Sequence, residues 1–128
     1  MSAKDCDRPV AVVEDDQVSR QALGRLLMAG GFEAALFDSA ESFIAAKPET
    51  SWLCVIVDVQ LTGMSGLNLQ QSLRATGSHV PIIITTGASN ERIRESAERE
   101  GCMAFLWKPY SPDTILALLD SLAGSTHA

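Results

Sequence analysis

The sequence predicts an α/β fold in which helices cover both faces of a parallel sheet. Short apolar runs alternate along the 128 residues with longer amphipathic or polar segments, which is the pattern of β-α-β units. Four of these runs are almost wholly apolar, as expected of strands that are buried on both faces. The strand-helix pair occurs five times without an internal linker, and the length fits a single domain.

Five strands are expected. Four coincide with the apolar runs near residues 10–14, 53–57, 81–85 and 103–107. Residues 32–37 form a shorter strand between the first two helices. We expect the compact domain to cover residues 9–123, between a flexible N-terminal arm at 1–8 and a C-terminal tail at 124–128.

The first helix is recognised by its two ends. Asp16 can cap its N-terminus, and Gly30-Gly31 can stop it. Its apolar face is expected to consist of Val18, Ala22, Leu23, Leu26 and Leu27. These signals predict a helix between Asp16 and Gly30, directly after the first strand.

The next two helices also begin at capping residues. Asp38 or Ser39 can cap the second helix, which is expected to turn Phe43 and Ile44 toward the core. Ser65 can cap the third helix. Both helices follow a strand closely, as β-α-β units require.

The fourth helix differs from the others. Between Ser89 and Gly101 only Ile93 and Ala97 are apolar at helical spacing, so little apolar area can be buried there. We expect this helix to dock weakly and to move when a neighbouring site changes state. A solvated helix face is the alternative interpretation, and the two are compatible. The fifth helix follows Ser111-Pro112, a cap and a first-turn proline.

Composition excludes several classes of function. The net charge of −6 has the wrong sign for contact with a nucleic-acid backbone, so we expect no direct nucleic-acid binding by this chain. No stretch resembles a membrane span or a signal sequence. The three cysteines, Cys6, Cys54 and Cys102, are odd in number and lack metal-site spacing, which indicates reduced thiols and a cytoplasmic location.

Polar residues follow four of the apolar runs at the point where each run ends. Glu14-Asp15-Asp16 follows the first, Asp58 the third, Thr85-Thr86 the fourth and Lys108-Pro109 the fifth. The carboxyl ends of parallel strands share one sheet edge, where ligands bind in open α/β sheets. Side chains of this kind suit phosphoryl chemistry, because a carboxylate can accept a phosphoryl group, and a hydroxyl and an ammonium can bind its oxygens.

The acidic residues at this edge favour a bound cation. Two carboxylates about 4 Å apart repel by roughly 4 kcal/mol at an effective dielectric of 20, so they tend to take up a proton or a metal ion. Oxygen ligands with water suit Mg²⁺. The alternatives are ordinary ones: Asp16 can serve only as a helix cap, and Asp58 only as a turn residue.

Together these positions resemble the receiver domain of two-component response regulators over residues 10–122. The resemblance rests on four segments: Val12-Val13-Glu14-Asp15-Asp16, Val57-Asp58 with Gly63 and Gly66, Pro81-Ile82-Ile83-Ile84-Thr85-Thr86-Gly87, and Phe105-Leu106-Trp107-Lys108-Pro109. It implies a doubly wound, flavodoxin-like three-layer sandwich with a five-stranded parallel sheet in the order 2-1-3-4-5 and five helices. It also implies that Asp58 accepts a phosphoryl group from the phosphohistidine of a histidine kinase or a phosphotransfer protein.

The resemblance assigns further roles. Asp15, Asp58 and the Gln60 carbonyl would bind Mg²⁺ directly, and Glu14 through water. Lys108 would pair with the phosphoryl oxygens, and the Lys108–Pro109 peptide bond would be cis. Thr86 would be the hydroxyl that moves toward them, and Phe105 the aromatic switch that follows it. Thr62 departs from the family, which usually has proline there.

The resemblance places the response on the face formed by the fourth helix, the fifth strand and the fifth helix. An output domain or effector protein, or a phosphorylation-dependent homodimer through residues 89–122, would read that face. The chain would catalyse its own phosphorylation and dephosphorylation without being a metabolic enzyme. Two alternatives stay open: an interaction module that works without phosphate, and a small aspartyl-phosphate phosphatase, which typically has a second acid where Gln60 stands.

Overall fold

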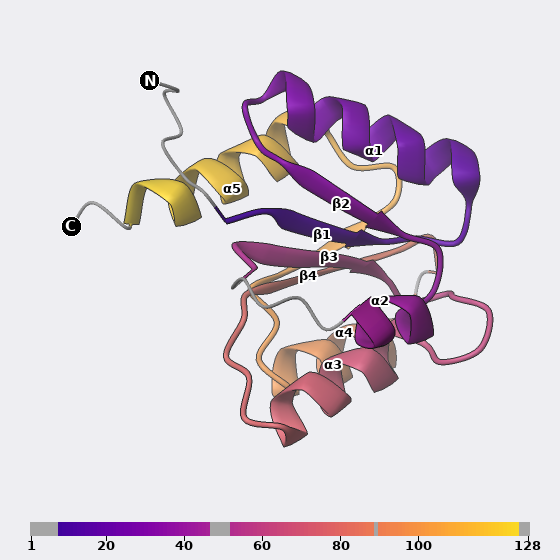
Figure 1. Ribbon diagram of the computed structural model, residues 1–128. Helices are drawn as coiled ribbons and strands as arrows, with labels where there is room; N and C mark the ends of the chain where they lie inside the picture. Colours follow the sequence, from indigo (N-terminus) through magenta and orange to yellow (C-terminus); the bar gives the residue numbers. More distant parts are fainter. Residues whose placement is uncertain (1–7, 47–51, 89, 126–128) are drawn as a thin grey trace.

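A computed structural model describes residues 8–46, 52–88 and 90–125, and its elements alternate strictly between strand and helix (Figure 1). The elements are β1 (Val10–Val13), α1 (Gln17–Ala29), β2 (Ala34–Phe37), α2 (Ala40–Ala46), β3 (Cys54–Asp58), α3 (Gly66–Ala75), β4 (Ile82–Thr86), α4 (Glu91–Arg99), β5 (Ala104–Trp107) and α5 (Pro112–Ser125). The strands differ from the predicted runs by only one or two residues at either end.

The five strands form one parallel sheet in the order β2-β1-β3-β4-β5, as predicted. The register keeps the carboxyl ends of the strands level. Val13 lies opposite Val57, Asp58 opposite Thr85, and Thr86 opposite Trp107. The residues that follow β1, β3, β4 and β5 therefore emerge along one edge of the sheet.

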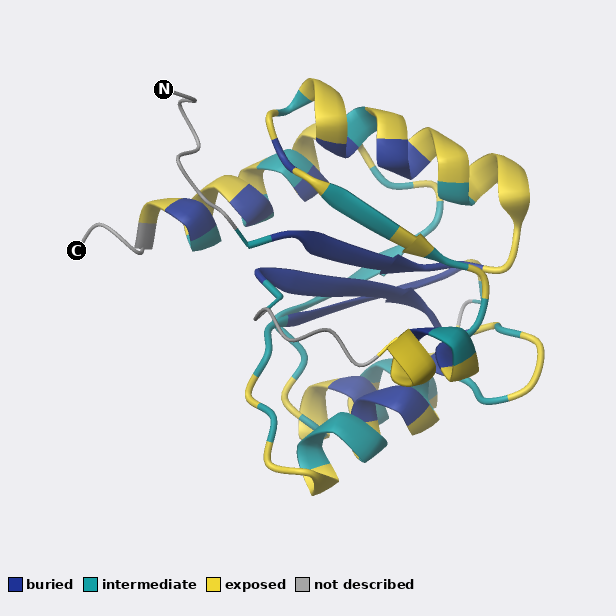
Figure 2. Cartoon of the chain, viewed as in Figure 1, coloured by how far each residue is buried: buried dark blue, intermediate teal, exposed yellow. Residues whose placement is uncertain are grey.

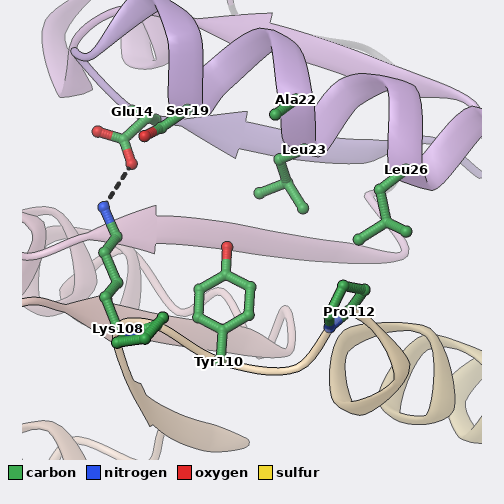
Figure 3. Close-up of a pocket in the computed structure, with 9 residues that line it drawn as sticks. Glu14, Ser19, Ala22, Leu23, Leu26, Lys108, Tyr110 and Pro112 are labelled. Carbon is green, nitrogen blue, oxygen red and sulfur yellow. Dashed lines mark hydrogen bonds and ion pairs between the residues drawn. The ribbon is translucent and has the colours of Figure 1, made fainter.

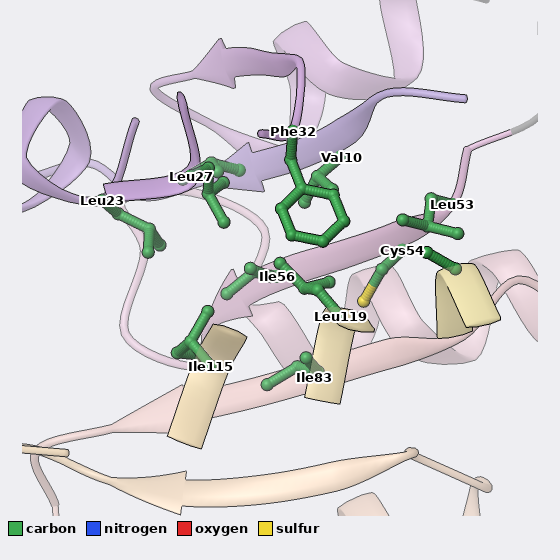
Figure 4. Packing of buried hydrophobic residues seen from close by; sticks show 12 residues of the cluster. Val10, Leu23, Leu27, Phe32, Leu53, Cys54, Ile56, Ile83, Ile115 and Leu119 are labelled. Atoms are coloured by element: carbon green, nitrogen blue, oxygen red, sulfur yellow. The ribbon is translucent and has the colours of Figure 1, made fainter. Parts of the chain in front are cut away.

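Alternation along the strands divides the core into two halves, one on each face of the sheet. The half under α1 and α5 contains Val10, Val12, Leu27, Ile56, Ile83, Ile115 and Leu119 (Figure 4). The half under α2, α3 and α4 contains Ala11, Val13, Val55, Val57, Leu69, Ile82, Ile84 and Ala97. The central strands are fully buried, whereas the edge strands β2 and β5 are mostly half-buried (Figure 2).

Side-chain caps fix the starts of α1, α2 and α3 at residues that the sequence indicates. The Asp16 carboxylate accepts from the Ser19 amide at 2.8 Å, and the Ser65 hydroxyl accepts from the Asn68 amide at 3.1 Å. Ser39 caps α2, since its hydroxyl accepts from the Ser42 amide at 3.0 Å. Each cap satisfies a backbone donor that the helix itself leaves unpaired.

Three predictions of inward-facing residues, Val18, Ala22 and Ile44, are wrong. Val18 was expected on the buried face of α1, but it is 75% exposed. Ile44 was expected in the core beside Phe43, and it is 38% exposed while Phe43 is buried. Successive helical residues are separated by about 100°, so Ile44 turns away from the direction of Phe43, and Val18 lies far around the helix from buried Leu23. Ala22 is exposed for the same reason.

The α4 helix buries little apolar area, as its sequence predicts: Ala97 is buried and Ile93 is half-buried. Its C-terminal end is nevertheless held by α3. The Arg74 guanidinium donates to the carbonyl oxygens of Glu100, Gly101, Ser78 and Val80 at 2.9–3.2 Å. The amide of buried Gln70 also donates to the Ala97 carbonyl at 3.0 Å. These contacts tie the end of α4, the loop before β4 and the start of the loop before β5 to one helix.

Some expectations concern residues outside the described ranges. These are the arm at 1–7, Cys6, the helix start at Ser89 and the tail at 126–128. The α5 helix continues to Ser125, two residues beyond the boundary that we placed at 123. Cys54 is buried in the core and burial raises the pKa of its thiol to about 12. None of the helices in the described part of the chain combines the length and apolar character needed to cross a bilayer.

Candidate functional site

The polar residues singled out at the ends of the strands gather along the carboxyl edge of the sheet. Glu14 comes directly after β1, Asp58 ends β3, Thr86 ends β4, and Lys108 comes directly after β5. Between 22 and 94 positions along the chain separate these residues. The parallel sheet and its level register bring them together, as the sequence predicts.

The amine of Lys108 joins two of the acids. Its Nζ lies 2.8 Å from Oδ2 of Asp58 and 2.8 Å from Oε1 of Glu14. Asp58 is 5% exposed and Glu14 is 6% exposed, whereas the side chain of Lys108 is 28% exposed. The lysine therefore reaches inward from the carboxyl edge of the sheet, the rim of the site, and neutralises two carboxylates that have little contact with water.

Burial and charge act on these groups in opposite directions. Desolvation is the largest influence on Glu14 and, together with the nearby charge of Asp58, raises the pKa of Glu14, although the hydrogen bond from Lys108 acts to lower it. For Lys108, desolvation acts to lower the pKa, but the hydrogen bonds and charges of the two carboxylates outweigh it, so its pKa is raised. Lys108 is therefore a stable cation at this site.

The loop that follows Asp58 wraps closely around it. The backbone amide of Gln60 donates to Oδ1 of Asp58 at 3.0 Å, so each carboxylate oxygen has one donor. Gly66, at the start of α3, lies against the same strand end, and a Cβ placed on it would be 2.3 Å from the carbonyl oxygen of Asp58. Only glycine fits this approach, because any Cβ would clash with backbone that cannot move aside.

The same loop is fixed at its outer side by two acids. Oδ2 of Asp15 accepts from both the amide and the hydroxyl of Thr62, each at 3.2 Å. Oε2 of Glu41, in α2, accepts from the Met64 amide at 2.9 Å. Gly63 lies between these two contacts with a φ of 86°, in the left-handed region that favours glycine. The loop is therefore attached both to the acidic segment after β1 and to α2.

Thr86 lies beside the site in its own small network. Its buried hydroxyl accepts from the Ala88 amide at 3.0 Å and lies 3.4 Å from Oε1 of Gln60. Phe105 is half-buried in β5, and its ring meets Trp107 edge-to-face at 4.9 Å. The threonine therefore contacts the loop that leads to α4, and the aromatic pair lies on the neighbouring strand.

The rim can offer a cation oxygen ligands only. No three acidic, histidine or cysteine side chains of the described residues gather at one metal position. A cation beside Asp58 would therefore rely on Asp15, Asp58, the Gln60 carbonyl and several waters. That donor set fits Mg²⁺, which binds oxygen and commonly keeps much of its water. Among the described residues, the Asp15 carboxylate bonds to Thr62 and makes no ion pair with Lys108.

A hollow of about 500 Å³ opens beside this rim, between α1 and the segment that leads to α5 (Figure 3). Glu14 and Lys108 form its polar end, and apolar side chains of α1 form one wall. Tyr110 lines it from the opposite side, and burial raises the pKa of its phenol, which keeps it protonated. The sequence does not indicate this hollow, because two segments that are distant along the chain, residues 14–26 and 108–112, build it together.

The sequence also failed to indicate the contacts of Thr62 and Glu41. The one available signal was that Thr62 stands where the similar family usually has proline. The Lys108–Pro109 bond is cis, as the resemblance implies.

Comparisons with known proteins agree with the geometry of the site. Residues 10–120 match the family described as the response regulator receiver domain. The transcriptional regulatory protein FixJ of Bradyrhizobium diazoefficiens is 36% identical over 112 residues, which are 88% of this chain and 55% of that protein. The transcriptional regulatory protein TdiR of Thauera aromatica is 34% identical over 107 residues, which are 84% of this chain and 47% of TdiR. The chain spans about half the length of these curated relatives.

Solved structures share the fold. The crystal structure titled FixJ-N superimposes with a TM-score of 0.81 at 28% identity, covering 94% of this chain and 95% of that one. The low-resolution structure of response regulator StyR gives a TM-score of 0.82 at 30% identity, covering 92% of this chain and 60% of that one. A CheY-like receiver domain from Methanospirillum hungatei JF-1, at 18% identity, covers 94% of this chain and 96% of its own with a TM-score of 0.84, and shows likeness of fold alone.

Proposed function

This chain belongs to the response regulator receiver domain family, and we propose that it is a phosphoacceptor of a two-component phosphorelay in which Asp58 receives the phosphoryl group. The observation that carries this proposal is the position of the Lys108 amine, 2.8 Å from the Asp58 carboxylate at the edge of the sheet. A carboxylate held beside a fixed cation can receive a group that brings further negative charge.

The transfer is a displacement at phosphorus. A carboxylate oxygen of Asp58 attacks the phosphoryl group of a donor phosphohistidine, and the phosphorus–nitrogen bond breaks as the phosphorus–oxygen bond forms. The imidazole leaves with the bonding electrons, and an acyl phosphate remains on Asp58. Water later attacks the phosphorus, which returns the carboxylate and releases inorganic phosphate. The hollow lined by Glu14 and Lys108 lies next to the acceptor, since Lys108 also contacts Asp58, and we propose that the donor side chain approaches from that side.

Charge neutralisation is the main contribution of the protein. Lys108 is already a stable cation between two carboxylates and can keep its contact as charge moves onto the phosphoryl oxygens. Asp15, Asp58 and the Gln60 carbonyl would hold Mg²⁺, with Glu14 acting through water. When bound, Mg²⁺ supplies a second cation, besides Lys108, to offset the charge of the phosphoryl oxygens. The oxygen-only donors of the rim support this assignment.

Phosphorylation would then shift an equilibrium between two conformations of the face formed by α4, β5 and α5. Thr86 would turn its hydroxyl from Ala88 toward the phosphoryl oxygens, and Phe105 would follow inward. The contact of Thr86 with the loop before α4 supports this route, since losing it frees one attachment of that loop. The sparse core contact of α4 also supports it.

The partners follow from the proposed chemistry. The donor would be a sensor histidine kinase or a histidine phosphotransfer protein. An output domain, an effector protein or a second copy of the chain would read the α4-β5-α5 face. The relatives extend well beyond the matched segment, which supports an output domain in the whole protein. The cysteine pattern supports a cytoplasmic location, and the negative charge supports an absence of direct nucleic-acid contact by this segment.

The test is covalent labelling. The chain is incubated with acetyl phosphate and Mg²⁺, and intact-protein mass spectrometry should detect one phosphate adduct. Asp58→Asn should abolish the adduct. The matched control is Asp38→Asn, since Asp38 follows β2 at the same end of the sheet but lies outside the lysine cluster, and it should leave the adduct unchanged.

Other outcomes would favour the alternatives. The absence of an adduct with acetyl phosphate and with phosphorylated kinase would favour the interaction module that works without phosphate. Steady turnover of a generic phosphomonoester would favour the aspartyl-phosphate phosphatase. The position of Gln60, where that enzyme class typically has a second acid, argues against the latter.

A further inference from the structure

The contact between Thr62 and Asp15 involves a position at which this chain departs from the usual pattern of the family, and it bears on the metal site. Both donors of Thr62, its amide and its hydroxyl, lie 3.2 Å from the same oxygen, Oδ2 of Asp15. The two residues are 47 positions apart, so the contact joins the loop after β3 to the segment after β1. Two donors on one carboxylate oxygen restrict rotation of the carboxylate more than one donor does.

The contact uses only one of the two oxygens of the Asp15 carboxylate. Because Thr62 occupies Oδ2, the carboxylate of Asp15 keeps Oδ1, which no donor of the described residues contacts. A ligand whose second oxygen is hydrogen-bonded is held in orientation by that partner, and such partners contribute strongly to metal affinity. Proline at this position would provide neither the amide proton nor the hydroxyl.

We propose that Thr62 is a positioning residue that orients the Asp15 carboxylate for Mg²⁺ binding. This inference rests on the proposed function, since it concerns the same cation. It adds a residue that touches neither the metal nor the phosphoryl group and acts only through Asp15. The contact explains how an exposed carboxylate at a loop can be kept ready for a cation despite the mobility of an exposed side chain.

The loop has a second attachment, which makes it possible to distinguish general stiffness of the loop from a direct effect of Thr62 on Asp15. Glu41 holds the Met64 amide at 2.9 Å without contacting Asp15. If general stiffness of the loop sets the metal affinity, removing Glu41 should weaken Mg²⁺ binding as much as removing the Thr62 hydroxyl. If Thr62 acts directly on Asp15, only the change at Thr62 should matter.

The experiment is calorimetric titration of Mg²⁺ into four proteins: the parent chain, Thr62→Val, Thr62→Ser and Glu41→Ala. Thr62→Val keeps the amide and the side-chain shape but loses the hydroxyl, and it should raise the Kd for Mg²⁺ about tenfold. Thr62→Ser keeps both donors and should restore the parent Kd. Glu41→Ala should stay within about twofold of the parent.

A second measurement separates positioning from damage to the fold. In the acetyl phosphate reaction, Thr62→Val should need more Mg²⁺ for half-maximal labelling and reach the parent rate at saturating Mg²⁺. A parent-like Kd for Thr62→Val, or an equal loss in Glu41→Ala, would overturn the positioning role while leaving the phosphoacceptor function intact. If the parent chain itself neither binds Mg²⁺ nor forms the adduct, both the function and the positioning role are refuted.

Discussion

The amine of Lys108 and the carboxylate of Asp58 are separated by 2.8 Å, although 50 positions of sequence lie between them. The pair is nearly buried on the acidic side and partly exposed on the basic side. The same amine lies 2.8 Å from Glu14, so one cation serves two carboxylates. Removing it would leave two charges that have little access to water, and this makes the lysine important for stability as well as for chemistry.

We expect Lys108→Met to lower the free energy of unfolding by about 2–3 kcal/mol at pH 7, less than for a fully buried pair because the lysine is partly exposed. The loss should shrink as the pH falls toward the ordinary Glu14 pKa of 4.5. The pKa of Glu14 is already raised in the folded protein, and it should rise further without the lysine. A raised folded pKa makes the ionised acid costly at neutral pH, and protonation removes that cost. Urea denaturation at pH 7 and pH 5 measures both values.

The control for this prediction is the double variant Lys108→Met with Glu14→Gln. Removing one of the two uncompensated charges should recover part of the lost stability at pH 7, and the difference between the two pH values should decrease. A loss that is equal at both pH values, or a double variant that is less stable than Lys108→Met alone, would contradict the electrostatic explanation.

Gly66→Ala should destabilise the fold because its Cβ would lie 2.3 Å from the carbonyl oxygen of Asp58. Backbone at the end of a central strand cannot move aside easily, so we expect a loss of about 2–3 kcal/mol. Gly124→Ala is the matched control, since Gly124 lies in α5 with nothing within 4 Å of the new Cβ. That change should raise stability by less than about 1 kcal/mol, because alanine favours helices. Thermal and urea unfolding of both variants would settle the comparison.

The sequence predicted the strands and the caps of α1, α2 and α3 because these depend on local rules. A run such as Val10–Val13 followed by Glu14 places the acid at the carboxyl edge of the sheet, independently of the conformation of the loops. The order of the strands came only with the resemblance to a family. Parallel topology then determined that Asp58 and Lys108 would lie near each other.

Errors occurred where angle or loop shape decides the outcome. Val18 and Ile44 were placed by counting apolar residues in a segment, whereas burial depends on their angle around the helix axis. The contact of Thr62 with Asp15 needs the exact path of a glycine-containing loop, which no local pattern specifies. The role of Arg74 depends on two loops that meet only in the folded protein.

Arg74→Met should lower the free energy of unfolding by about 1–3 kcal/mol, because its guanidinium donates to four backbone carbonyls. Hydrogen exchange should speed up most at the C-terminal end of α4, where Glu100 and Gly101 lose their donor. The matched control is Arg94→Met, which removes only exposed ion pairs with Glu91 and Glu98 and should leave the free energy of unfolding nearly unchanged, because solvent screens such pairs. Equal effects of the two changes would show that the four carbonyl contacts contribute nothing specific.

Trp107 should report the switch that we propose for Phe105, because the two rings meet edge-to-face at 4.9 Å. The chain has two tryptophans, so Trp52→Phe leaves Trp107 as the single reporter. Adding Mg²⁺ and beryllofluoride, a phosphoryl mimic, should change its emission, since inward rotation of Phe105 removes one neighbour of the indole.

Two variants serve as controls for this prediction. Trp107→Phe leaves Trp52, which packs on Phe37 and Phe43 beside the opposite edge strand, and its emission should not change. Thr86→Ala should greatly weaken the Trp107 response, because the switch requires the hydroxyl to follow the phosphoryl group. A full response in Thr86→Ala would mean that Phe105 moves independently of Thr86.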